Sequence, residues 1–181
     1  MNERDDAQDA WAEQTTLPLE FDMNTLIARA RRFERAIRRR NQIEIGTGAA
    51  IAVIFVVAAV QFDIPAMRFG ALGVAIGALF VVGVLRTKGR VEPLPVDLSS
   101  GAYLGAYRAA LLRQARLLAW APVWYVLPLL VPAAVFVSGI RQPGEPFELG
   151  NFTLLLVIGA IVSVVNLHAA RQLRREASAL E

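Results

Sequence analysis

Four long stretches of the chain are apolar and nearly free of charge. They cover residues 45–62, 69–86, 117–140 and 152–170. Each has the length at which a helix, rising about 1.5 Å per residue, crosses a hydrocarbon layer about 30 Å thick. Buried helices of soluble proteins are usually shorter and keep a polar face. The pattern therefore predicts an all-α, polytopic membrane protein with four transmembrane helices, arranged as two helical hairpins.

The polar stretches divide the chain into further segments. In chain order, we expect an acidic mobile tail at 1–22, a basic amphipathic helix at 23–44, a four-span membrane domain at 45–170 and a C-terminal tail at 171–181. Inside the membrane domain, residues 87–116 are predicted to form a connector followed by a helix. Pro93 and Pro95 exclude a helix at the connector, because proline has no N–H to donate. Ser99 or Ser100 can then cap a helix that begins near Gly101.

Basic residues alternate along the chain in a way that predicts its orientation. Lys and Arg number eight before the first span, then one, six and one in the three loops, and three after the last span. Loops rich in Lys and Arg stay in the cytoplasm. The alternation therefore predicts four spans with both termini cytoplasmic, and places the helices that flank the spans at the cytoplasmic surface. No removable signal peptide is expected, because residues 1–22 contain no apolar segment.

Six arginines lie within ten residues ahead of the first span, including Arg31, Arg32, Arg38, Arg39 and Arg40. Anionic lipid headgroups attract basic clusters at this position, so these five arginines are candidates for headgroup binding. Nucleic acid is the less favoured alternative, because Phe33 is the single aromatic residue in the run. Anionic headgroups of the bilayer are therefore expected to supply the negative charge that these arginines bind.

An apolar stripe runs along the other face of the same helix. Phe33 and Ile37 continue a helical spacing that leads to Asn41 and Glu44. A carboxylate at the membrane edge needs a partner. The favoured partner of Glu44 is Arg40, one turn away, and the alternatives are Arg113, Arg116, Arg171 and His168. The stripe, together with Trp11 in the tail, is a candidate either for binding a protein partner or for helix packing.

Small residues and prolines mark the second and third spans. Gly73 and Gly77 form a GxxxG pair, which lets two helices approach closely. The pair could pack within the chain or join two copies, and the oligomeric state stays open. The third span contains Pro122, Pro128 and Pro132, which predict a kink.

Reactive side chains are scarce in the predicted spans. The chain has no cysteine, which excludes disulfides and thiolate metal sites, and its single histidine is His168. We therefore expect no catalytic, cofactor-binding or metal-binding residues, and predict a non-enzymatic protein. A coupled carrier normally keeps a charge near the middle of the membrane. A small carrier or pore is therefore the alternative, and protein binding by the cytoplasmic helices is the preferred function.

Four blocks of the sequence resemble a known group of proteins. They are Trp11 with Gln14, FERAIRRRNQIE from Phe33 to Glu44, PLPVDL from Pro93 to Leu98, and RQARLLAWAPVWYVLP from Arg113 to Pro128. Over residues 10–130 the chain resembles small uncharacterised bacterial inner-membrane proteins that are often encoded beside extracytoplasmic-function sigma factors. The resemblance implies a location in the bacterial inner membrane and an anti-sigma-like or accessory role, in which the segment from Trp11 to Asn41 would contact a sigma factor.

Overall fold

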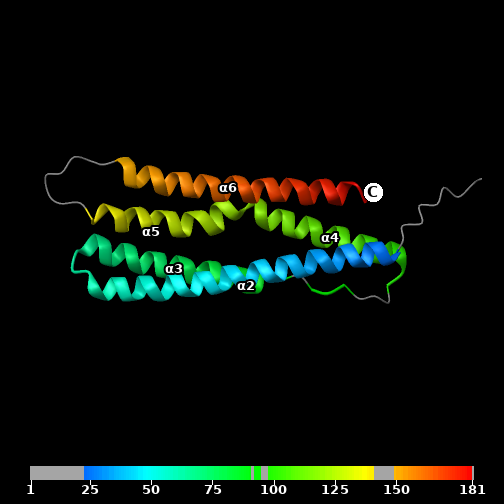
Figure 1. Ribbon diagram of the computed structural model, residues 1–181, viewed down its shortest axis with the longest axis horizontal. Helices are drawn as coiled ribbons and strands as arrows, with labels where there is room; N and C mark the ends of the chain where they lie inside the picture. The colour runs from blue at the N-terminus through cyan, green and yellow to red at the C-terminus, as the bar shows by residue number, and fades with distance from the viewer. Residues whose placement is uncertain (1–22, 91, 95–97, 141–148, 181) are drawn as a thin grey trace, which may run out of the picture.

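The computed structural model describes residues 23–90, 92–94, 98–140 and 149–180. Within these ranges all regular structure is helical and no strand is present (Figure 1). The all-α fold predicted from the sequence is confirmed. The predicted acidic tail, and with it Trp11, lies outside the described residues.

Helix α2 (Met23–Gln61) joins the basic stretch and the first apolar stretch in a single helix of 39 residues. At about 1.5 Å per residue such a helix is about 58 Å long, roughly twice the thickness of a hydrocarbon layer. Its apolar second half alone is long enough to cross that layer. If the apolar half crosses such a layer, the arginine-rich first half extends beyond it as part of the same helix.

Helix α3 (Pro65–Thr87) runs back along α2 after a short turn (Figure 1). Pro65 lies in the first turn of the helix. The N–H groups of that turn have no carbonyl acceptor within the helix, so the N–H that proline lacks is not needed there. Half of the apolar window of α3 is buried, against 11% of the windows in α2 and α6. This difference identifies α3 as the central helix, with α2 packed on one side and α5 on the other.

The third apolar stretch is broken near its start, in contrast to the single span predicted at 117–140. Helix α4 (Ser100–Ala119) ends just inside the stretch, and a π-helical turn η1 (Pro122–Val126) leads into α5 (Leu127–Ser138). The axis changes direction by 48° between α4 and the segment after it. Proline removes a backbone donor and its ring clashes with the carbonyl one turn earlier, so the chain widens to a bond from the Leu127 N–H to the Pro122 carbonyl.

Helix α4 begins at Ser100, close to the predicted start, with Ser99 at the N-cap position. The Ser99 side chain makes no capping hydrogen bond there. The helix start is instead held by backbone bonds, including one from the Tyr103 N–H to the Ser99 carbonyl at 2.9 Å. The predicted boundary is therefore nearly correct, although the predicted capping bond is not made.

Helix α6 (Leu149–Ser178) packs against η1 and α5 and, further along, against α4. The long helices lie side by side in an elongated molecule, in the order α2, α3, α5 and α6 (Figure 1). The start of α2 and the end of α6 lie at the same end of this molecule (Figure 1).

Among the described residues three helices, α2, α3 and α6, are long and apolar enough to cross a membrane, and the bent pair of α4 with η1–α5 makes a fourth if it forms one span. These lengths and compositions are those of a membrane protein with three to four candidate spans.

Candidate functional site

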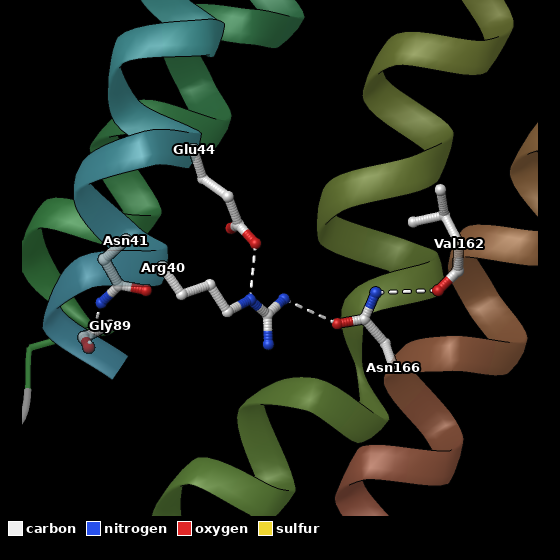
Figure 2. A network of polar contacts seen from close by, with 6 residues as sticks. All are labelled: Arg40, Asn41, Glu44, Gly89, Val162 and Asn166. Atoms are coloured by element: carbon white, nitrogen blue, oxygen red, sulfur yellow. Dashed lines mark hydrogen bonds and ion pairs between the residues drawn. The ribbon is translucent and has the colours of Figure 1, made fainter. Parts of the chain in front are cut away.

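A polar network joins α2 to α6 where α2 enters its apolar half (Figure 2). The Arg40 Nε donates a hydrogen bond to Glu44 Oε1 at 2.6 Å, and its Nη2 donates to Asn166 Oδ1 at 2.9 Å. Asn166 is buried and in turn donates to the Val162 carbonyl at 2.8 Å. Arg40 therefore connects α2 to α6 at this level of the molecule.

Glu44 finds its partner one turn away. Of the five candidates, the structure pairs it with Arg40 rather than with Arg113, Arg116, Arg171 or His168. The two side chains are 39% and 19% exposed, so the pair is partly screened from water. The second carboxylate oxygen, Oε2, is buried and has no hydrogen-bond partner among the described residues. One oxygen of this carboxylate therefore accepts a hydrogen bond, and the other accepts none from the described residues.

Asn41 fixes the end of α3 against α2 (Figure 2). Its side chain is buried, and its Nδ2 donates to the Gly89 carbonyl at 2.6 Å. A Cβ atom at Gly89 would lie 2.6 Å from the Leu85 carbonyl oxygen, so the close turn after α3 needs glycine. Ile37, one turn earlier on the stripe, is buried as well. Partner binding and helix packing were the two roles expected for Ile37 and Asn41, and in the structure both residues take part in helix packing.

The first half of α2, α4 and the end of α6 form a separate packed unit, which we name the tyrosine bundle. Its core contains Leu26, Ala30, Tyr103, Tyr107, Leu111 and Ala177. Phe33 packs edge-on against Tyr107 with ring centroids 6.0 Å apart, so this stripe residue also serves packing. The Tyr107 hydroxyl donates to Glu176 Oε1 at 2.7 Å. Burial, and then the bond to Glu176, raise the pKa of Tyr107.

Gly73 and Gly77 hold α3 against the proline-containing α5. A Cβ at Gly73 would lie 2.6 Å from the Pro132 Cβ, and one at Gly77 would overlap the Pro128 carbonyl oxygen. Pro132 has no N–H, so the Pro128 carbonyl lacks the donor that a helix normally supplies four residues later. Gly77 brings its Cα next to this carbonyl, a position where a Cα–H contact is favourable. The glycine pair is therefore used within the chain.

An open groove of about 1870 Å³ lies between α2, the end of α3 and the end of α4. We name it the cationic groove, because six basic residues line it: Arg38, Arg86, Lys88, Arg90, Arg113 and Arg116. Phe80, Trp120 and Trp124 line it too. Trp124 Nε1 donates to the Leu117 carbonyl at 3.0 Å, while Trp120 is 62% exposed. Arg113 and Arg116 thus belong to this groove and not to the Glu44 network.

The sequence did not reveal this groove, because its basic residues come from three distant segments. The sequence nevertheless contained one indication of the groove, because the basic residues of α3 and α4 flank the ends of the second and third apolar windows. Only the packing of the helices shows that these flanking positions converge.

The five arginines predicted to bind headgroups have different surroundings. Arg31, Arg32 and Arg39 are exposed along α2. Arg38 is exposed and pairs with Glu34 at 2.7 Å. Arg40 is the exception, because the Arg40–Glu44–Asn166 network engages it inside the molecule. Arg40 thus links two helices, and its contact with a lipid headgroup stays a prediction.

The described side chains offer groups for binding. Ser163 donates to the Gly159 carbonyl at 2.7 Å, and His168 shares a 3.0 Å hydrogen bond with Gln172, so these two residues do not form a nucleophile and base pair. No set of three metal-binding side chains gathers anywhere in the described ranges. Guanidinium, amide and indole groups remain, and they bind anions, carbonyls and apolar chains.

The sequence was compared with known protein families, with curated proteins and with solved structures, and none of the three comparisons gave a match.

Proposed function

We propose that the chain spans the bacterial inner membrane four times, with both termini in the cytoplasm. The bent segment from α4 through α5 supplies the third crossing in this arrangement. Two observations support it: the alternation of basic residues between loops, and the position of the start of α2 and the end of α6 at the same end of the molecule. An even number of crossings is needed to bring both ends to one side.

Single cysteines test this topology, because the chain contains none of its own. Ala28→Cys and Ala179→Cys place thiols at exposed positions on α2 and after α6, and Asp63→Cys places one in the fully exposed turn before α3. A membrane-impermeant maleimide added to intact spheroplasts should label Asp63→Cys alone. Labelling of the two others before lysis would contradict cytoplasmic termini.

We further propose that the tyrosine bundle binds a soluble protein partner in the cytoplasm. The observation that carries this proposal is a packed unit with its own aromatic core, to which α2 contributes the half that precedes its apolar residues. Its surface carries exposed arginines on α2 and α6, including Arg32 and Arg174. Such a surface favours a partner with an acidic face. The resemblance described above makes a sigma factor the candidate.

A photo-crosslinking amino acid at Arg32 or Arg174 tests this function in native membranes. Each position should capture one soluble protein in a fixed ratio to the chain. The same crosslinker at Val57, 49% exposed in the apolar half of α2, should capture no soluble protein and serves as the control. If neither bundle position captures a partner, in growth or under envelope stress, partner binding is refuted.

A small carrier or pore is the second candidate, and the π-helical turn favours it. Tyr125 in η1 lies near Glu44 and Arg40, so the broken helix lies beside the polar network. Single π turns within helices often occur at functional sites. Reconstituted liposomes test this directly: solute or ion flux above that of empty vesicles would support a carrier, and an equal flux would exclude it.

A further inference from the structure

The cationic groove lies at the boundary between apolar and charged segments on three helices at once. Ile45 on α2, Val84 on α3 and Leu117 on α4 line it at the ends of their apolar windows. The basic residues of α3 and α4 follow or precede these positions by a few residues. A molecule in the groove would therefore contact a charged wall on one side and an apolar wall on the other.

The charged wall has an excess of positive charge. Its six basic residues are accompanied by two acidic ones, Glu34 and Glu92, and Glu34 already pairs with Arg38. The other five, Arg86, Lys88, Arg90, Arg113 and Arg116, make no side-chain hydrogen bond or ion pair within the described part of the chain. The ends of α3 and α4 each contribute about half a negative charge. Positive charge remains after these contributions, which favours a bound anion.

The apolar wall indicates what kind of anion fits. Phe80 and Trp120 are 51% and 62% exposed, and Trp124 lies beside them in the lining. Indole rings favour the level of lipid headgroups, where one edge meets water and the face meets hydrocarbon. A free phosphate would make no use of these rings. An amphiphile with a phosphate and a hydrocarbon chain would use both walls.

We propose that the cationic groove binds one anionic glycerophospholipid, with its phosphate on the arginines and its hydrocarbon chains along Phe80 and the two tryptophans. Guanidinium groups suit this role, because they bind phosphate oxygens through paired N–H donors. The site is separate from the general attraction between the α2 arginines and the membrane surface. It is also independent of the proposed protein partner, which would bind the tyrosine bundle.

Tryptophan fluorescence in lipid nanodiscs tests this site. The full chain carries Trp11→Phe, so that Trp120 and Trp124 are the emitting residues. The nanodiscs contain phosphatidylcholine and a small fraction of phosphatidylglycerol with brominated chains, which quench adjacent indoles. Quenching should saturate at about one anionic lipid per chain. Brominated phosphatidylcholine at the same fraction should quench only in proportion to its amount, and equal quenching by the two lipids would overturn the proposal.

Two charge-matched variants locate the site. The groove variant carries Arg90→Gln, Arg113→Gln and Arg116→Gln, and the control carries Arg171→Gln, Arg174→Gln and Arg175→Gln, which do not line the groove. Each lost groove arginine should weaken binding about fivefold, giving roughly a 100-fold shift for three. The control should shift less than about threefold. Equal shifts in both variants would show surface attraction only and would refute the groove.

Two further measurements, a competition with soluble phosphates and a single-residue variant, complete the test. Glycerol phosphate and inorganic phosphate, added at millimolar concentration, should not displace the brominated lipid. If either does, the groove binds soluble phosphates and the lipid proposal fails. If the triple variant does not fold, Arg113→Gln alone should still show about a fivefold shift, and an unchanged affinity would count against the site.

Discussion

Replacing Gly77 with alanine should separate α3 from α5. The added Cβ would overlap the Pro128 carbonyl oxygen and lie 2.9 Å from the carbonyl carbon. A side chain in that place could rotate away, but a backbone carbonyl inside a helix cannot. The two helices must therefore move apart, and with them the contact between Gly73 and Pro132 is loosened.

The cost can be estimated from the kind of atom that obstructs the new methyl group. Overpacking a tight contact costs about 1 to 3 kcal/mol. Because the obstruction here is backbone on both sides, we expect the upper part of this range, about 2 to 3 kcal/mol, which lowers the folded-to-unfolded ratio roughly 30- to 150-fold. Gly83→Ala is the matched control in the same helix, since its Cβ meets nothing within 4 Å. Alanine there should be neutral or stabilise by up to about 1 kcal/mol.

Reversible unfolding in mixed micelles, with increasing mole fraction of dodecyl sulfate, measures both variants against the parent chain. The reasoning holds if Gly77→Ala unfolds at a lower fraction of dodecyl sulfate while Gly83→Ala does not. It fails if the two variants have the same stability, because the close approach of α3 to the Pro128 carbonyl would then have no energetic consequence.

Three further predictions concern the polar and aromatic contacts. Asn41→Ala leaves the Gly89 carbonyl without its donor and should lower the free energy of unfolding by about 1 to 3 kcal/mol in the same micelle titration. Leu111→Ala removes a fully buried side chain from the tyrosine bundle and should cost about 2 to 5 kcal/mol, seen as faster proteolysis of that unit. Since the pKa of Tyr107 is raised in the folded protein, the free energy of unfolding should fall as the pH rises above about 10, and Tyr107→Phe should flatten part of that slope.

The first two of these predictions have a control within the chain. Gln42→Ala, exposed beside Asn41, and Leu112→Ala, 40% exposed beside Leu111, should change stability by less than about 0.5 kcal/mol. A control that destabilises as much as its buried neighbour would contradict the assigned burial. For the pH dependence, an identical slope in Tyr107→Phe and the parent chain would show that the Tyr107 proton is not held by the fold.

Local spacing predicted the parts of the fold that depend on one helix at a time. The stripe through Phe33, Ile37 and Asn41 was readable because buried positions recur every three or four residues, and all three residues pack inward. No helix breaker lies between Leu26 and Gly46, and α2 is unbroken there.

Features that depend on several helices could not be predicted from local spacing in this way. The pairing of Glu44 with Arg40, one turn away on the same helix, was the favoured prediction and is found. The bond from Arg40 to Asn166 was not predicted, because it depends on how α2 is placed relative to α6. The prolines predicted a kink but not the π-helical turn, since that depends on where the freed carbonyls find donors. The cationic groove was missed for the same reason, as Arg38, Arg90 and Arg113 come together only through packing.

The contrast between α2 and the segment from α4 to α5 has a mechanical consequence. The tyrosine bundle is attached to the apolar helices by two continuous helices, α2 and α6, and by one connection that bends by 48° beside Trp120. A force applied to the bundle would be transmitted along α2 and α6, while the third attachment would absorb it as a change of angle. The bundle is thus held by two stiff supports and one joint, and Arg40 links the two supports close to that joint.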